Sequence, residues 1–211
     1  MLTSNAARRA TRGFSLVELM VALVVGLVVV GAVLALVVSI IESNRETLQA
    51  TRLNQELRAT LAVIANDLRR ARSVEDPLTV AMAAGGNPYA AVSTASAGCV
   101  VYAYDGALNG PWHLIKLDSG AVVLQGVGTR PASCSPTGTP VRLGSDQVQI
   151  TALTFTPTTT TGTPPQATDE TLVREVTVTI TGHLVDPNTG LAGISRTVSQ
   201  TVFVRSVGVG I

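Results

Sequence analysis

A run of about 23 residues without a charged side chain, from Leu19 to Ile41, constrains the fold of this 211-residue chain more than any other feature. As an α-helix, which rises about 1.5 Å per residue, this run would be roughly 34 Å long and could cross a bilayer. A cleavable secretory signal peptide has a shorter apolar core that is followed by a small-residue cleavage site. The run therefore predicts a membrane-spanning helix rather than a signal peptide.

An acidic residue, Glu18, stands directly before the apolar run. An acid at depth in an apolar segment costs about 2.5–3.5 kcal/mol on insertion scales. A plain membrane anchor does not account for this residue, so we expect a partner that compensates its charge. The alternative is an acid that extends to the membrane surface. Upstream, Arg8, Arg9 and Arg12 predict a cytoplasmic N-terminus.

The residues around Glu18 resemble a known processing site. Residues 12–19, Arg-Gly-Phe-Ser-Leu-Val-Glu-Leu, are similar to the leader junction of type IV prepilins and of the related pseudopilins of type II secretion. This resemblance implies that prepilin peptidase removes residues 1–13 by cleavage after Gly13 and methylates the new N-terminal amine of Phe14. It also implies that Glu18 pairs with the N-terminal amine of a neighbouring subunit in a filament core. Such a pair suits a low dielectric, where neither charge is tolerated alone.

From residue 42 the composition becomes polar but remains typical of a helix. Apolar residues recur there at spacings of three or four and form one stripe: Leu53, Leu57, Leu61, Ile64 and Leu68. We expect this stripe to pack on a sheet of the same chain, because the repeat is too short for a coiled coil. One helix from Phe14 to Arg72 would be roughly 90 Å long, and the arginines of its last turn would suit a helix C-terminus.

The remainder of the chain alternates short β-type runs with Gly, Pro, Asn and Asp. Strands are expected over 99–104, 112–117, 121–125, 148–156, 171–185 and 193–205. The segments 118–120 and 186–190 predict hairpin turns. Val176, Val178 and Ile180 alternate with threonines, which indicates a sheet with one buried face.

These patterns predict an α+β fold, with a long N-terminal helix packed on an antiparallel β-sheet domain. The resemblance implies the same type IV pilin-like architecture. The expected divisions are a leader (1–13), a transmembrane or filament-core half of the helix (14–41), an amphipathic periplasmic half (42–75) and a β-rich head (76–211).

The two cysteines, Cys99 and Cys134, fall in this predicted head. With a cytoplasmic N-terminus, the head lies on the oxidising side of the membrane, where a disulfide persists. Closing a loop of about 35 residues would stabilise the fold by roughly 3–4 kcal/mol in the chain-entropy model. We expect a disulfide, with two free thiols as the alternative. Two isolated cysteines without neighbouring histidines do not have the spacing of metal ligands.

The sequence contains no motif for catalysis. His113 and His183 are its only histidines, each alone on a predicted strand, where a satisfied or exposed side chain is expected. Nucleophile-elbow, zinc-protease, phosphate-loop and dinucleotide-binding motifs are missing from it. A formal net charge of +1 gives no basic surface for nucleic acid. We therefore expect no enzymatic activity, no cofactor and no metal, and expect the chain to be a substrate of prepilin peptidase.

Shorter stretches refine the resemblance. Residues 20–27, 57–60, 67–71 and 99–105 are similar to PilW-type minor pilins, and the last of them also to the J-type pseudopilins of type II secretion. The resemblance implies a minor pilin that primes or caps a type IV pilus. A type II secretion pseudopilus component and a monomeric membrane-anchored periplasmic binding module are the alternatives.

The resemblance also implies partners and a location. The expected partners are other minor and major pilins or pseudopilins, prepilin peptidase and the inner-membrane assembly platform. The expected location is the bacterial inner membrane, crossed once, with the C-terminal domain in the periplasm, and afterwards the pilus or pseudopilus.

Overall fold

The structure is a computed structural model that describes residues 13–83, 86–94, 96, 98–136, 138–158, 170–185 and 195–205. The first twelve leader residues and the predicted turn at 186–190 lie outside this description. In chain order the elements are α1 (Leu16–Leu68), α2 (Pro77–Met82), β1 (Cys99–Ala103), β2 (Trp112–Asp118), β3 (Ala121–Val127), β4 (Val141–Leu143), β5 (Val148–Thr158), β6 (Glu175–Leu184) and β7 (Ser195–Phe203). The chain divides between Thr47 and Leu48 into two compact units.

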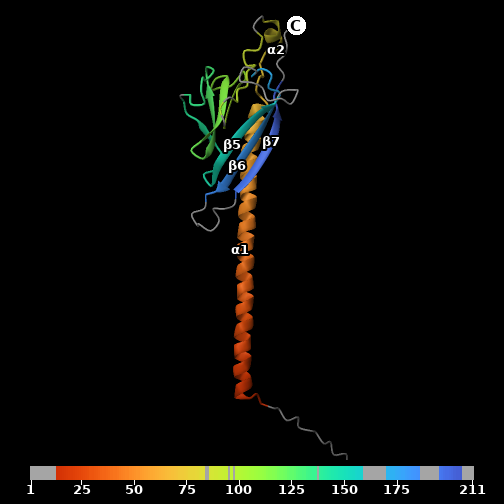
Figure 1. The fold of residues 1–211 in the computed structure, drawn as a ribbon, viewed down its shortest axis with the longest axis vertical. Helices are drawn as coiled ribbons and strands as arrows, with labels where there is room; N and C mark the ends of the chain where they lie inside the picture. The colour runs from red at the N-terminus through yellow and green to blue at the C-terminus, as the bar shows by residue number, and fades with distance from the viewer. Residues whose placement is uncertain are drawn as a thin grey trace, which may run out of the picture. The chain divides into compact units, whose positions relative to one another are not determined.

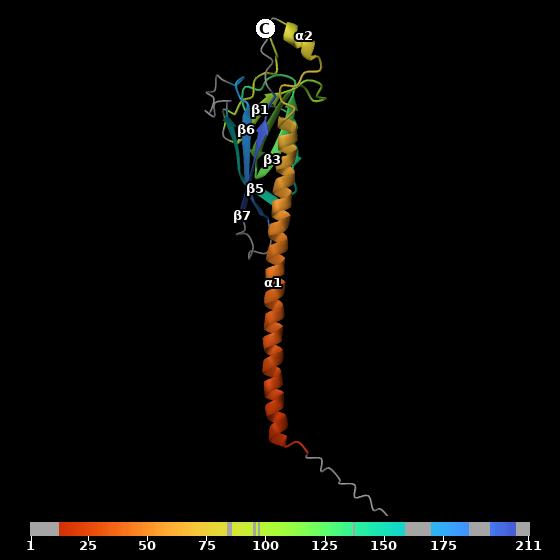
Figure 2. The same ribbon diagram turned by 90° about the vertical axis from the view of Figure 1, so that its right-hand side faces the viewer.

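The predicted fold class is confirmed: a long N-terminal helix is followed by antiparallel β-structure. The described strands form two sheets instead of one, with the orders β1-β2-β3-β4 and β5-β6-β7 (Figures 1 and 2). The ladder between β5 and β6 is irregular between Ile150 and Ala152. There the Ile150 N–H donates to the carbonyl of Gly120, at 2.8 Å, so this bond links the β2–β3 turn to β5 across the two sheets.

The hairpin turn predicted at residues 118–120 is confirmed by the pairing of β2 with β3. Ser119 and Gly120 both have positive φ angles, of 50° and 79°. Two successive residues in this region form the tight turn whose twist matches that of the flanking strands. The pair Asp118 and Ala121 closes the turn and sets the register of both strands.

The predicted helical stripe is the centre of the core. Every one of its five side chains is at most 4% exposed. They share one cluster with the inward side chains of β6, Val176, Val178 and Ile180, which are completely buried. The β5–β7 sheet lies beside this part of α1 (Figure 1). The threonines of β6 alternate with these residues and are only half-buried, as predicted for a sheet with one buried face.

Two elements were not predicted. The short helix α2 begins after Asp76, whose carboxylate accepts hydrogen bonds from the N–H groups of Leu78 and Thr79, both at 3.1 Å. An acid followed by proline is a recognisable helix start. Strand β4 has three residues, and its burial does not alternate. A strand this short carries no periodic signal in the sequence.

The end of α1 differs from the prediction. The helix ends at Leu68 rather than Arg72, and its last turn contains no basic residue. The chain then tightens, because the N–H of Ala71 bonds to the carbonyl of Leu68 at 3.1 Å. Arg72 has a φ of 67°, a left-handed conformation that costs an L-residue roughly 1–2 kcal/mol. In this conformation its N–H donates to the carbonyl of Ala103, at 2.8 Å, at the end of β1.

The side chain of Arg72 is buried, with 3% of its surface exposed. Its guanidinium donates to five backbone carbonyls, those of Ala90, Glu170, Thr171, Val173 and Arg205, at 2.5 to 3.1 Å. Burial, together with the nearby charge of Arg174, lowers the pKa of Arg72 to about 10, so the group remains charged at neutral pH. The guanidinium fork thus joins the end of α1 to three separate stretches of chain.

We expect Arg72→Ala to destabilise the protein by more than about 3 kcal/mol, because each buried carbonyl left unpaired costs about 1–3 kcal/mol. Arg72→Gly removes the same bonds but tolerates the positive φ, so it should be at least as stable as Arg72→Ala. Arg69→Ala, an exposed neighbour, should change stability by less than about 0.5 kcal/mol. Urea unfolding of the full chain in detergent measures all three. Equal stability of Arg72→Ala and Arg69→Ala would contradict this role.

Candidate functional site

The predicted cleavage site lies directly before the first turn of α1. Gly13, Phe14 and Ser15 precede the helix, and Phe14 is 83% exposed. The Oγ of Ser15 accepts a hydrogen bond from the N–H of Glu18 at 3.2 Å, and its carbonyl accepts one from Leu19 at 3.1 Å. Ser15 is therefore the N-cap of α1, and only Phe14 separates the junction between Gly13 and Phe14 from the cap.

The cap gives Ser15 a role that was not predicted from the sequence. A serine followed three residues later by glutamate, just before an apolar run, has the spacing of a capping box. That signal was present in the sequence. Glu18 is exposed in the first helical turn, where a negative charge is favourable because of the helix dipole. The carboxylate of Glu18 forms no ion pair with a cationic side chain among the described residues.

In the first unit, the helical residues from Leu19 to Ile41 have an apolar surface on every side. All side chains from Leu16 to Ile41 are exposed, and one 18-residue window is apolar enough to cross a membrane, with none of it buried. Burying such surface is favourable by about 25 cal/mol per Å². A contiguous apolar surface of this extent marks a contact with a membrane or with other protein.

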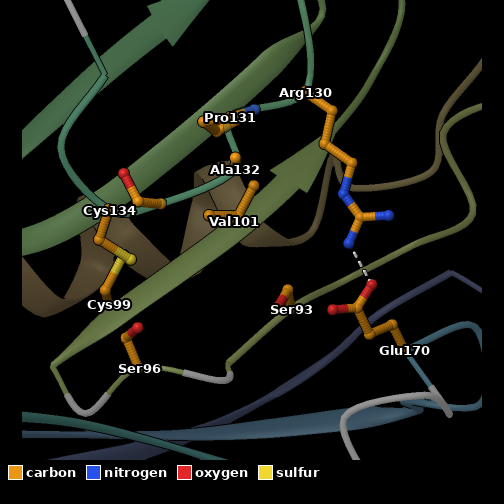
Figure 3. A pocket seen from close by; sticks show the side chains of 10 residues that line it. Ser93, Ser96, Cys99, Val101, Arg130, Pro131, Ala132, Cys134 and Glu170 are labelled. Carbon is orange, nitrogen blue, oxygen red and sulfur yellow. Dashed lines mark hydrogen bonds and ion pairs between the residues drawn. A yellow bond between two sulfur atoms is a disulfide. The ribbon is translucent and has the colours of Figure 1, made fainter.

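In the second unit, Cys99 and Cys134 form a disulfide, with their Cα atoms 6.4 Å apart. The bridge connects β1 to the loop after β3, beside a pocket of about 460 Å³ (Figure 3). Arg130 and Glu170 form an ion pair across this pocket, and the Arg130 guanidinium also lies 5.5 Å from the ring centre of Trp112. The disulfide and the ion pair both hold the loop after β3 against the rest of the unit.

A polar network surrounds Asp67, in the last turn of α1. Its carboxylate accepts hydrogen bonds from the hydroxyls of Tyr102 and Tyr104, the second at 3.1 Å. Tyr104 stacks on His113, with 4.2 Å between the ring centres, and Arg70 lies 4.1 Å from the Tyr104 centre. The stacked rings of Tyr104 and His113 thus connect the end of α1 to β2.

Burial and the charge of Asp67 shift the acidities in this network. They raise the pKa of Tyr104 to about 12 and that of Tyr102 well above its ordinary value. Burial lowers the pKa of His113, although Asp67 opposes this shift, so the ring is neutral at pH 7. The expectation that His113 is satisfied or exposed is wrong, because it is 6% exposed and its Nε2 has no partner among the described residues.

Among the residues that the structure describes, no group of three or more His, Cys, Asp and Glu side chains could hold a metal ion. The residues that the sequence predicts to be functional fall into two separate sets. Gly13, Phe14 and Glu18 belong to the first unit, whereas Cys99 and Cys134 belong to the second.

Comparison with known proteins gives two family matches. The model of the family described as prepilin peptidase-dependent protein B matches residues 46–204, and the prokaryotic N-terminal methylation motif matches residues 8–40. No curated protein is significantly similar in sequence. Among solved structures, a type IV-like pilin from Thermus thermophilus is 16% identical, with a TM-score of 0.45, over 74% of this chain and 96% of that chain.

The buried His113 predicts a pH dependence of stability. Because its pKa is lowered in the folded state, the unfolded chain binds a proton first as the pH falls. The contribution of the neutral His113 ring to the free energy of unfolding is therefore complete above about pH 6.5, the ordinary histidine pKa. It declines as the pH falls below that value. His113→Phe keeps a ring beside Tyr104 but cannot be protonated, so its unfolding free energy should fall less between pH 7.5 and pH 5. His183→Phe is the matched control, and equal slopes for wild type and His113→Phe would disprove the effect.

Proposed function

Because this chain belongs to the family of prepilin peptidase-dependent protein B, we propose that it is a minor pilin that primes or caps a type IV pilus. In this proposal it is a substrate of the peptidase and a structural subunit, not an enzyme. The observation that carries the proposal is the capped start of α1, where the Gly13–Phe14 junction is followed at once by an exposed apolar helix.

In the proposed process, cleavage after Gly13 frees the α-amine of Phe14, which is then methylated, and Glu18 becomes the fifth residue of the mature chain. A filament core excludes water, so an amine and a carboxylate from adjacent subunits stabilise each other there more than either is tolerated alone. The apolar surface of each helix is buried against its neighbours in the same step. Assembly thus compensates both the exposed apolar surface and the charge of Glu18.

The same proposal assigns a place in the cell. The arginines of the leader favour a cytoplasmic N-terminus, and α1 contains an apolar window long enough for one crossing of the inner membrane. The disulfide between Cys99 and Cys134 supports a periplasmic location for the second unit, because such bonds persist in oxidising compartments. Priming would proceed by bundling of membrane helices with those of other minor pilins at the assembly platform.

The N-terminus of the mature protein tests the processing step. We expect intact-mass and N-terminal peptide measurements to show a chain that begins at methylated Phe14, and a chain that keeps residues 1–13 in a strain without prepilin peptidase. A monomeric membrane-anchored binding module would keep its leader in both strains. Recovery of unprocessed protein from working filaments would refute the proposal.

Substitutions at Glu18 and Ser15 separate charge pairing from helix capping. Glu18→Gln removes the charge but preserves the capping-box spacing, which glutamine also satisfies. We expect it to be inserted and processed yet to enter sheared filaments at least tenfold less than wild type, as Glu18→Ala should. Ser15→Ala keeps the charge and should reduce incorporation only slightly. Normal incorporation of Glu18→Gln together with loss for Ser15→Ala would show that the cap matters and the charge does not.

Co-purification distinguishes a subunit of a type IV pilus from a subunit of a type II secretion pseudopilus. If the filament fraction that contains this subunit carries pilus-machine proteins, the pilus assignment holds. If it carries secretion-channel proteins, the chain is a pseudopilus component instead.

A further inference from the structure

The β5–β7 sheet ends at a strand whose outer edge is free among the described residues. β7 pairs with β6 over nine residues in an unbroken register, and none of these nine forms a backbone hydrogen bond with another described segment. Figure 1 shows β7 at one side of its sheet. An edge strand presents a row of unpaired N–H and C=O groups, so it can pair with an additional strand.

The other described edges of the two sheets are protected. The edge of β1 is covered by Ser93, which exchanges two backbone hydrogen bonds of 2.8 Å with Val101. Strand β4 has only three residues. Strand β5 has an irregular register and contains Pro157, and its Ile150 N–H is already bonded to Gly120. Short strands, bulges and prolines are features that prevent unwanted pairing at a sheet edge.

Strand β7 lacks these features. From Thr197 to Phe203 it contains no proline, no lysine and no other charged residue, and its ladder with β6 has no bulge. Arg196, its one charged residue, lies next to the first residue of the strand. Among the described edges, that of β7 is therefore the one that is open to strand addition.

The direction of the free backbone groups follows from the register. The N–H of Val204, directly after β7, donates to the carbonyl of Arg174, directly before β6, at 2.8 Å. In an antiparallel ladder, residues that bond to the partner strand alternate with residues whose backbone groups point away from it. The even-numbered residues of β7 therefore bond to β6, whereas Thr197, Ser199 and Thr201 direct their N–H and C=O groups to the free edge.

A groove beside this edge adds side-chain contacts. It has a volume of about 530 Å³ and is lined by Arg58 and Leu61 from α1 and by residues 197–200 of β7. Val198 packs on the core but is only half-buried, so part of its apolar surface is uncovered. A strand added at the edge would direct every second side chain into this groove, toward Leu61 and Val198.

The charge of the groove indicates which kind of chain can fill it. Arg58 is the only charged residue of the described lining, and its exposed guanidinium forms no ion pair with the described residues. A second copy of this chain, paired at the same edge, would add another Arg58 and no acid. A segment that contains a carboxylate would instead form a charge-assisted hydrogen bond with the guanidinium.

We propose that β7 accepts an extended, acid-containing segment of a different protein chain by strand addition. The segment forms backbone hydrogen bonds with Thr197, Ser199 and Thr201 and places a carboxylate side chain opposite Arg58. In this mode of binding the main-chain bonds supply affinity, and the side chains that enter the groove supply selectivity. The inference depends on residues of the second unit alone and holds whether or not the chain enters a filament.

Synthetic peptides test the proposal on the full chain in a nonionic detergent. The probe is the blocked peptide Thr-Val-Thr-Glu-Thr-Val-Thr, which as a strand has its glutamate and both valines on one face. One comparison peptide has lysine in place of the glutamate, and another has proline at both threonines beside it. By titration calorimetry we expect saturable binding of the glutamate peptide, at least about fivefold weaker binding of the lysine peptide, and none of the proline peptide.

Amide hydrogen exchange of the wild-type protein tests the binding mode without relying on a variant's folding. The N–H groups of Thr197, Ser199 and Thr201 should exchange rapidly in the free protein and slowly with saturating glutamate peptide. Those of Val198 and Gln200 bond to β6 and should exchange slowly in both states. Such an alternation is the signature of an added strand, because only every second amide gains a partner.

Two variants and a control locate the binding. Arg58→Glu should reverse the preference, so that the lysine peptide binds more tightly than the glutamate peptide. Arg69→Glu alters an exposed residue outside the groove lining and should leave the preference unchanged. Ser199→Pro removes an N–H at the free edge but no bond to β6, so it should weaken binding at least about tenfold.

Four results would overturn the proposal. The first is that the glutamate peptide does not bind saturably at millimolar concentration. The second is that the lysine or the proline peptide binds wild type as tightly as the glutamate peptide does. The third is that the amides of Thr197, Ser199 and Thr201 gain no protection with the bound peptide. The fourth is that their protection rises with protein concentration alone, which would assign the edge to a second copy of this chain.

Discussion

The buried guanidinium of Arg72 decides how the long helix ends inside the β-rich unit. A helix terminus leaves backbone groups without partners, and a buried terminus must satisfy them. The left-handed backbone of Arg72 directs its N–H to the end of β1, while its side chain satisfies carbonyls from three other stretches. One turn earlier, Asp67 bonds to Tyr102 in β1 and to Tyr104 just after it. The helix end and β1 are therefore joined by backbone and side chains together.

The two units of the chain differ in how their apolar side chains can be buried. The second unit buries its apolar stripe against its own sheet, so it has a core of its own. The described helical residues of the first unit have their apolar side chains exposed, so their burial requires a membrane or neighbouring helices. This contrast is what a membrane-inserted subunit that later enters a filament would need. It also explains why the helical sequence is uniformly apolar up to Ile41 and has a single apolar stripe from Leu53 onward.

Periodic burial is what made much of the fold predictable. The stripe from Leu53 to Leu68 and the alternation along β6 are both local patterns, and both lie in the core as expected. The helix end was predicted wrongly because arginine is normally exposed. Its acceptors, such as Glu170 and Arg205, are 98 and 133 residues away in sequence, beyond any local pattern. The division into two sheets and the polar network around Asp67 likewise depend on contacts between distant segments, whereas the cap at Ser15 was visible in the sequence.

The position of that cap has an electrostatic consequence for a processed chain. Cleavage after Gly13 would leave only Phe14 ahead of Ser15, so a new ammonium group would stand at the positive end of the helix dipole. Like charges would then be concentrated at the tip of an isolated helix, with Glu18 of the same chain offsetting only part of the repulsion. A carboxylate from a second helix would remove the remainder. Proteolysis would thus raise the energy of the solitary subunit, and this would make the cut itself a source of driving force for association.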